Sequence, residues 1–449
     1  MKKKLLLCAF LSVGLGLFAE TINLEQARTL ALANSKTLEK YSLAIRSSIL
    51  DERNQLYSML PSISAEYSAN MSYLNRNWGF ENPIDTFSAG ATFSITQIIF
   101  QGGKSFIQKA ISSIATESIR NEALAEYFNI LDAVDNAYYS VLEAAASLKA
   151  EETSLETAVL SLSMAEIRHT NGIINQGDYL RALADKEARE NSRNQARRNI
   201  TLSVSRLKVL AGIQGTVEFA EIELDEFEQV IERLAGITDE ETDVLYDELR
   251  KKLAANPALA RAGLNSQRAE KNLTLTRRDY SPTLSATIFS TGLNYSQVNG
   301  FSNNTAGGIQ IRGKIPLDFW ITANRIERSR LAVDSAALDY SNTEVNLETE
   351  LLSALLNTLV QAGSVLSSRR TLEYTEKHFE YVMERYRLLQ SSVSDLSEAS
   401  SLLITSRNNL IRSSYGFLQS LSRLRSLGAI EDEEQLIEIL LGNISLNTP

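Results

Sequence analysis

The clearest pattern in the chain is the strict two-residue alternation of "PSISAEYSANMSY", residues 61 to 73. Alternation of this length predicts a β-strand with one apolar and one polar face. A second segment, 87–100, keeps the same period. Segments 283–296 and 305–317 predict two further strands, with a phase slip near Phe289 that indicates a bulge. The apolar positions of the first strand are Ile63, Ala65, Tyr67, Ala69, Met71 and Tyr73.

Most of the remaining chain has a helical period. The longest predicted helix, 103–170, has apolar positions spaced alternately by three and four residues, which favours a left-handed coiled coil. Its ~100 Å length matches two shorter helices stacked end to end. These positions are Leu131, Val134, Tyr138, Val141, Ala145 and Leu148. The other predicted helices are 24–60, 178–213, 246–280, 321–388 and 395–428.

The chain is internally duplicated at an offset of 217 residues. "RLKVLAGI" (206–213) matches "RLRSLGAI" (423–430), and the offset also pairs Arg168 with Arg385 and Asp178 with Asp395. Each half reads as helix, β-hairpin, long helix and last helix. The predicted parts are the first repeat 20–213 with its hairpin 62–100, a linker 214–245, the second repeat 246–428 with its hairpin 283–317, and a C-terminal segment 429–449.

The N-terminal segment "MKKKLLLCAFLSVGLGLFAE" predicts a secretory signal peptide, residues 1–19, cleaved after Ala19. It contains the only cysteine, Cys8. No run of ~18 apolar residues follows, so we expect no transmembrane helix in the mature chain. The net charge of −10 argues against nucleic acid as the partner. Residues 218–248 hold 13 acidic residues and one basic residue, which indicates a solvated acidic surface in an equatorial linker.

The strands are long enough to cross a bilayer at a tilt. Four strands cannot close a membrane barrel, because the smallest have about eight. Several copies must therefore share one barrel, with lipid outside and water inside. Aromatic residues at the strand ends favour an interfacial girdle. A soluble β-sandwich with core aromatics is the alternative. The girdle candidates are Trp78, Phe100, Phe319 and Trp320.

No motif in the chain supports an enzyme. "GGKS" at 102–105 lacks the glycine that a phosphate loop needs at position 98, where Ile98 stands. His169 and His378 are not duplicated by the repeat, and no cysteine or histidine cluster suits a metal. We therefore predict a non-enzyme without cofactor or metal.

With these motifs the chain resembles the TolC-like outer membrane efflux proteins. The pieces that carry the likeness are "QIIFQGGK" (97–104), "VDNAYYSVL" (134–142), "NGIINQGDYLRA" (171–182) and "SRLKVLAG" (205–212). The resemblance implies a mainly α fold, a coiled-coil barrel of long helices, with four strands per chain in a trimeric, twelve-stranded transmembrane β-barrel.

The resemblance also implies the function. A homotrimer would be the exit duct of a tripartite efflux pump or a type I secretion system. It would be opened at its periplasmic tip by an adaptor and an inner-membrane RND or ABC transporter. The alternative from the helices alone is a soluble periplasmic adaptor or stalk protein.

The family pattern implies a gate at the turns after the two long helices. Asp178, Asp395 and Glu398 fall on the acidic entrance positions. Tyr386 falls on the tyrosine that ties the closed tip to the first-half aspartate, and Gly172 on the tip glycine; the arginine position holds Ser391. The alternative reading is helix capping, with Asp178 as an N-cap and Asp395 with Glu398 as a capping box.

Overall fold

The computed structural model describes residues 20–74, 84–215, 217–222, 227–296, 300–302 and 306–442. Trp78 and the predicted signal peptide lie outside this range. The described residues form two compact units. The coiled-coil unit takes in the described parts of Met1–Ser35, Phe128–Leu249 and Leu351–Pro449, and the sheet unit comprises Lys36–Tyr127 and Arg250–Glu350.

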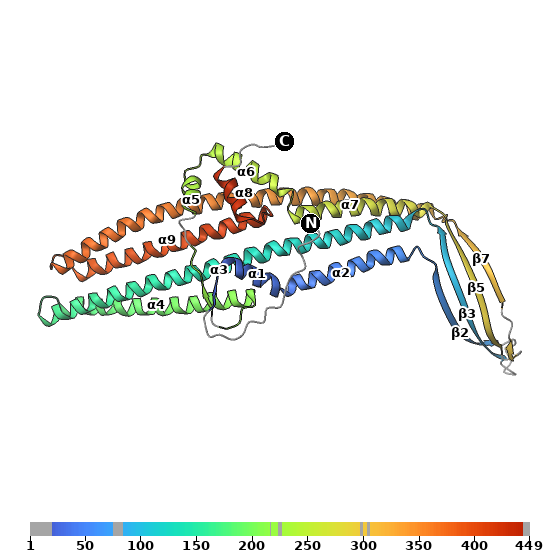
Figure 1. Cartoon of the computed structure of the whole chain (residues 1–449), viewed down its shortest axis with the longest axis horizontal. Helices are drawn as coiled ribbons and strands as arrows, with labels where there is room; N and C mark the ends of the chain where they lie inside the picture. Colours follow the sequence, from blue (N-terminus) through green and yellow to red (C-terminus); the bar gives the residue numbers. More distant parts are fainter. Residues whose placement is uncertain are drawn as a thin grey trace. The chain divides into compact units, whose positions relative to one another are not determined.

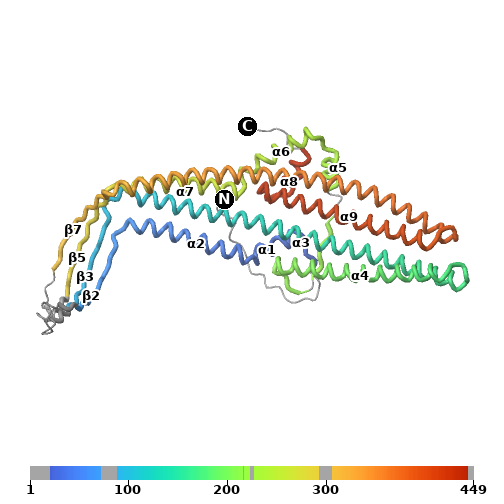
Figure 2. The backbone as a smooth tube through the Cα atoms, turned by 180° about the vertical axis from the view of Figure 1, so that it is seen from behind, coloured from blue at the N-terminus to red at the C-terminus, as the bar shows by residue number. Residues whose placement is uncertain are grey.

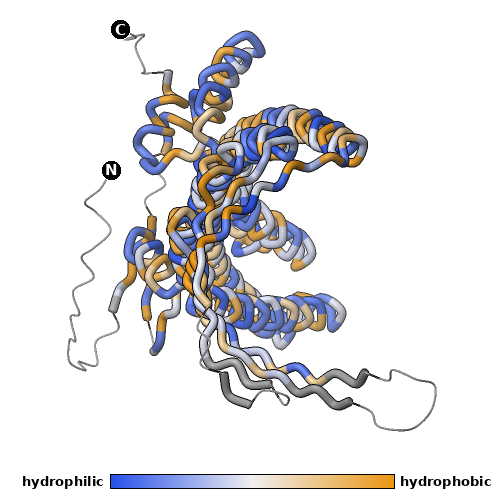
Figure 3. Tube along the Cα trace, turned by 90° about the vertical axis from the view of Figure 1, so that its right-hand side faces the viewer, coloured by the Kyte–Doolittle hydropathy of each residue, from blue (hydrophilic) through white to orange (hydrophobic). Residues whose placement is uncertain are grey.

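Two long antiparallel helical hairpins build the coiled-coil unit (Figure 1). One joins the second part of α3 (Lys104–Thr170) to α4 (Gln176–Ala211), and the other joins the second part of α8 (Phe319–Arg387) to α9 (Val393–Leu427). Apolar and polar segments alternate along these helices in Figure 3, as expected for helices that bury one face. The shorter helices are α1 (Leu24–Asn34), α5 (Glu228–Ala235), α6 (Asp239–Leu253) and α10 (Glu433–Leu441).

A two-stranded parallel ladder joins the start of the first repeat to the linker. β1 (Glu20–Ile22) pairs with β4 (Val217–Phe219). The buried Tyr138 hydroxyl of α3 donates to the carbonyls of Ile22 (3.0 Å) and Ala220 (2.7 Å), which fastens this ladder to the helix. The linker and C-terminal segments are therefore more than solvated surface. α5 and α10 each bury three apolar side chains, and Arg233 donates to the Leu440 carbonyl.

The sheet unit contains four long antiparallel strands in the order β2-β3-β5-β7 (Figure 2). Strand β3 joins the two hairpins by pairing with β5. Among the described strands, the long strands β2 and β7 each pair with one neighbour only. The remaining elements are β2 (Ser62–Leu74), β3 (Ile84–Phe100), β5 (Thr283–Ser296), β6 (Gly300–Ser302), β7 (Ala306–Lys314), α2 (Lys36–Tyr57), α7 (Pro257–Arg277) and a 3₁₀ turn (Arg278–Tyr280).

The two faces of this sheet differ in chemistry. One register row crosses all four strands with isoleucine at every position, the isoleucine row: Ile63, Ile95, Ile288 and Ile309. The next row lies on the opposite face and is polar throughout, the hydroxyl row: Ser62, Thr96, Thr287 and Gln310. Ile63 and Ile309 are 66% and 74% exposed, so the sheet unit does not itself cover the apolar face at these strands.

Several predicted boundaries were wrong. The helix predicted over 24–60 breaks at Ser35, and the one over 246–280 breaks at Asn256, which caps α7 before Pro257. The pairing of β5 continues through Phe289 without a bulge. Phe289 instead lies against Gly308, where an added Cβ would meet its ring at 3.2 Å. The irregularities in the β3–β5 pairing lie between Ala89 and Ala91 and between Ile98 and Phe100.

One helix departs from the prediction that no transmembrane segment follows the signal peptide. Within the described residues, α8 contains an 18-residue window with mean hydropathy 1.3, apolar and long enough to cross a membrane by composition alone. In this helix residues 351–368 carry no charged side chain, although serine, asparagine and glutamine interrupt the apolar run. The fully buried Leu351 and Leu355 belong to the core of the coiled-coil unit.

Candidate functional site

The two turns that close the helical hairpins are duplicated in their backbone hydrogen bonds. After α3, Ile173 N donates to the Arg168 carbonyl (2.8 Å); after α8, Gln390 N donates to the Arg385 carbonyl (2.8 Å). Both turns need a left-handed residue, which is Gly172 (φ 72°) in the first and Leu389 (φ 65°) in the second. This bond pattern is the Schellman ending of a helix. The repeat therefore extends to the conformation of the turns.

Neither aspartate in these turns caps its helix in the predicted way. The N-cap of α4 is Asn175, whose side chain accepts from Asp178 N (2.9 Å). The N-cap of α9 is Ser392, which forms a capping box with Asp395 at the third helical position. The predicted N-cap Asp178 and the predicted capping box of Asp395 with Glu398 were therefore wrong. Each observed N-cap lies three residues earlier in the sequence. The prediction took the acid after glycine as the cap and overlooked the neutral side chain before it.

The three predicted entrance carboxylates all lie near these turns. Asp178 is half-buried in the first turn of α4, and Asp395 is exposed in the first turn of α9. Glu398, one turn further along α9, is also exposed. The amide and hydroxyl of Ser392 hold the pKa of Asp395 below its usual value, with a smaller contribution from Arg385. Asp395 is thus held as an anion at the start of the helix.

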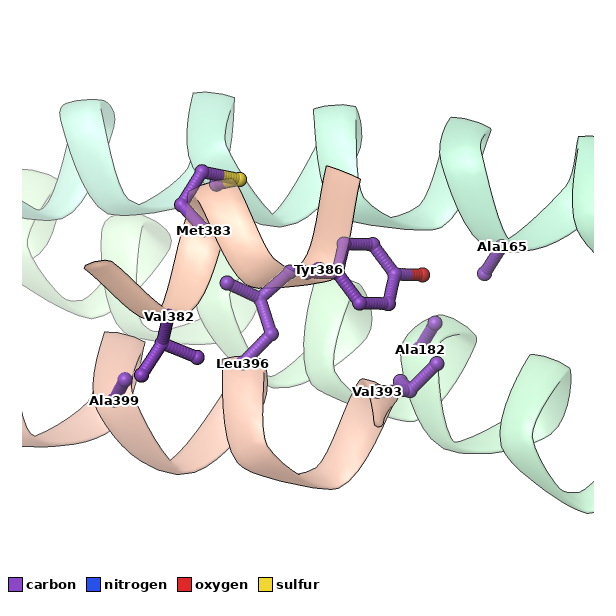
Figure 4. Packing of buried hydrophobic residues seen from close by; sticks show 8 residues of the cluster. All are labelled: Ala165, Ala182, Val382, Met383, Tyr386, Val393, Leu396 and Ala399. Atoms are coloured by element: carbon purple, nitrogen blue, oxygen red, sulfur yellow. The ribbon is translucent and has the colours of Figure 1, made fainter. Parts of the chain in front are cut away.

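Tyr386 is fully buried in the last turn of α8, in a cluster shared by both hairpins (Figure 4). Its ring projects toward Ala165 of α3 and Ala182 of α4. Its hydroxyl has no hydrogen-bond partner among the described residues, so the implied bond to Asp178 is absent. Burial raises the pKa of Tyr386, Arg168 opposes that rise, and Asp178 adds to it. The structure thus brings Tyr386 and Asp178 into electrostatic range without a hydrogen bond.

Arg168 is part of this site and was not predicted. It lies on α3, is 8% exposed, and stacks its guanidinium 3.8 Å from the centroid of the Tyr386 ring. Its Nη2 also donates to the Tyr386 main-chain carbonyl. The repeat that pairs Arg168 with Arg385 was the only sequence signal for it.

The predicted girdle residues lie where strands meet helices in the sheet unit. Phe100 ends β3, and Phe319 and Trp320 begin α8; all three are at least half exposed. Tyr280 stacks on Phe319 with ring centroids 6.2 Å apart. Nearby, Asp279 accepts from Lys104 (2.7 Å) and Arg325 (3.0 Å), which ties α3 and α8 to the turn before β5. The chain therefore enters and leaves the sheet through braced, aromatic-rich turns.

A buried ion network in the coiled-coil unit was also missed. Asp135 of α3 is fully buried between Arg28 of α1 and Arg425 of α9, and accepts a hydrogen bond from Ser422 as well. Glu433 of α10 pairs with both arginines. Burial alone would lower the pKa of Arg28, but pairing with Asp135 and Glu433 raises it above its usual value. The network therefore fastens four helices through charge.

Within the described residues, no group of three His, Cys, Asp or Glu side chains is placed to hold a metal ion. The acidic tip residues and the buried network are both concentrations of charge within the described residues. Neither contains a nucleophile with a histidine base.

The chain belongs to the outer membrane efflux protein family. The family model matches residues 27–213 and 249–429, which are the two halves of the repeat. The protein is thus a non-enzymatic outer membrane channel that extends into the periplasm, and the soluble adaptor or stalk alternative is excluded. No curated protein matches the chain.

Solved channel structures share this fold at low sequence identity. The Campylobacter jejuni CmeC outer membrane channel is 16% identical with a TM-score of 0.74, over 94% of this chain and 90% of that one. CusC is 15% identical with a TM-score of 0.77, over 91% and 93%. The open state of the Neisseria gonorrhoeae MtrE outer membrane channel is 15% identical with a TM-score of 0.70, over 90% and 88%.

Proposed function

We propose that three copies of this chain form one exit duct, with a twelve-stranded barrel in the outer membrane and a helical tunnel in the periplasm. The observation that carries this is the two-faced sheet. Its isoleucine row is exposed at Ile63, Ile288 and Ile309, and among the described strands each outer long strand has one unpaired edge. Lipid offers no hydrogen bonds, so both edges must be paired by other copies. Two copies would give about eight strands, whose interior side chains fill. Three copies are the smallest set with a bore.

The duct serves a tripartite efflux pump or a type I secretion system. A conduit of this kind has no energy source of its own, so a periplasmic adaptor and an inner-membrane RND or ABC transporter would load and open it. Nucleic acid is not a partner, because the chain carries a net charge of −10. Outer membrane lipid surrounds the barrel, with Trp78, Phe100, Phe319 and Trp320 as its aromatic girdle.

The duplicated turns form the gate at the periplasmic entrance. Threefold symmetry would gather Asp178, Asp395 and Glu398 of each copy around one axis. Close carboxylates raise one another's pKa and attract cations. Gly172 allows the tight turn, and Tyr386 holds the two hairpins of a copy together. The closed entrance is therefore an acidic ring braced by an apolar cluster.

Adjacent residues of β7 test the membrane assignment. Ile309 lies in the isoleucine row and Gln310 in the hydroxyl row, and both side chains are exposed. A lysine that faces lipid is destabilising, by about 1 kcal/mol or less near the interface and by about 2–4 kcal/mol at the middle of the bilayer. Ile309→Lys should therefore reduce heat-sensitive trimers in the outer membrane fraction, while Gln310→Lys should assemble normally. Equal tolerance of both lysines would overturn the lipid-facing assignment.

Planar-bilayer recording tests the bore and its acidic entrance. The purified protein should give stable conductance that a hexammine cation added from the periplasmic side blocks. The Asp395→Asn, Glu398→Gln double variant should weaken that block, with Glu25→Gln as a remote control. Block that is unchanged in the double variant would reject the acidic ring.

A further inference from the structure

The two equivalent arginines at the hairpin turns have different partners. Arg385 donates to the carbonyl of Gln390 (2.8 Å), within its own turn. Arg168 donates instead to the carbonyl of Tyr386, 218 positions away on the other hairpin. Since the turns share their backbone bonds, the difference lies in what each side chain reaches. Of this duplicated pair, Arg168 alone bridges the hairpins.

The contact of Arg168 is electrostatic. Its guanidinium lies 3.8 Å from the centroid of the Tyr386 ring, close enough for a cation–π interaction. Its second partner is a carbonyl in the last turn of α8, where the helix dipole is negative. In the described part of the chain, Arg168 has no carboxylate partner. The ring face and the carbonyl thus stabilise a charge that is 8% exposed.

Loss of this contact would be costly, because both groups are buried. Tyr386 is fully buried among Ala165, Ala182, Val393 and Leu396. Its hydroxyl makes no hydrogen bond, so the ring and not the hydroxyl is the part that Arg168 recognises. Separation of the hairpins would leave the guanidinium without either partner.

We propose that Arg168 is the latch of the periplasmic gate, holding α8 closed against α3 through the Tyr386 ring and carbonyl. This rests on the proposed channel function and adds a residue to its gate. The latch lies within one copy and links its two hairpins.

Single-channel recording of the full-length purified protein, without adaptor or transporter, tests the latch. Arg168→Gln should raise the open probability about tenfold, the change expected from one strong buried contact of this kind. Arg197→Gln, which removes an exposed arginine of α4, is the control and should leave the open probability unchanged. Arg168→Lys keeps a cation over the ring, so its open probability should be closer to that of the wild type than the open probability of Arg168→Gln is.

A pair of tyrosine variants keeps the test independent of the arginine. Tyr386→Phe retains the ring and removes only an unpaired hydroxyl, so the channel should stay closed. Tyr386→Leu removes the π face and should open it. Opening by Tyr386→Phe would overturn the latch, and so would equal open probabilities of Arg168→Gln and the control Arg197→Gln. A wild-type protein that forms no trimer and no pore would reject the channel function itself.

Discussion

Asp135 and Arg28 form a bidentate ion pair across 107 positions of sequence, with hydrogen bonds of 2.6 and 3.0 Å. Asp135 also accepts from Arg425, so one fully buried carboxylate, together with Glu433, balances two buried guanidinium groups. Removal of one partner from such a group leaves uncompensated charge in the interior. The network therefore marks the place where α1, α3 and α9 cannot separate without a large cost.

The first prediction concerns that carboxylate. Asp135→Ala should lower the free energy of unfolding by about 3–5 kcal/mol, because both buried arginines lose their one fully buried anion and keep only the partly exposed Glu433 in common. Chemical denaturation followed by the helical circular dichroism signal measures the loss. Glu25→Ala removes the exposed partner of Arg28 and should cost less than about 1 kcal/mol. Equal losses would show that burial of Asp135 does not matter.

A second prediction uses the glycines between β3 and α3. Gly102 (φ 66°) has no room for a side chain, since an added Cβ would lie 2.4 Å from the Ser281 Cβ. Gly103 (φ 76°) has open space around it. Gly103→Ala should lower the free energy of unfolding by roughly 1–2 kcal/mol, because alanine is disfavoured in the left-handed backbone conformation. Gly102→Ala should lower it distinctly more, because the added Cβ also collides with Ser281. The yield of heat-sensitive trimer measures the two effects, and it should be lower for Gly102→Ala than for Gly103→Ala. A lower yield for Gly103→Ala would contradict the prediction.

The left-handed residue of each tip turn gives a third prediction. Leu389 has the backbone conformation that Gly172 adopts in the equivalent turn. Leu389→Gly should relieve strain and stabilise the protein by about 0.5–1 kcal/mol, and Gly172→Leu should destabilise it by about 1 kcal/mol. Thermal unfolding compares the two variants. If both variants shifted the unfolding temperature in the same direction, backbone strain at these positions would not be the cause of the change in stability.

The fourth prediction is a pH dependence at the start of α9. Ser392 lowers the pKa of Asp395 in the folded protein, so the ionised acid favours the capping box. This stabilisation is fully present above the ordinary carboxyl pKa and is lost as the pH falls through the lowered value. The protection factor for hydrogen exchange in the first turn of α9, which corrects for the intrinsic slowing of exchange in acid, should therefore fall as the pH falls. Asp395→Asn should show fast exchange at neutral pH and little further change below it.

The order of strands and helices was predictable because local patterns encode it. Alternation in residues 61–73 and three–four spacing in α3 each depend on neighbours in sequence. The break before Pro257 also had a local signal, since asparagine followed by proline is a common helix start. The break between α1 and α2 at Ser35 had a weaker local signal in the sequence. Helix caps at Asn175 and Ser392 were missed because each lies three residues before a more conspicuous aspartate.

The charged parts of the site could not be predicted in the same way. Arg28, Asp135, Arg425 and Glu433 come from four helices, and no local period relates them. Arg168 and Arg385 are equivalent in the repeat, yet only the packing of one hairpin on the other gives Arg168 its partner. Long-range contacts of single side chains leave no trace in one sequence.

The hydroxyl row has a consequence for what the duct can carry. Serine and threonine hydroxyls rotate to donate or accept as needed and bear no formal charge. A bore lined by them at this level hydrates positive, negative and neutral solutes alike. This row would then exert no valence filter of its own, and discrimination by charge would fall to Arg312 and Lys314 on the same face of β7, to the acidic entrance and to the transporter that feeds it.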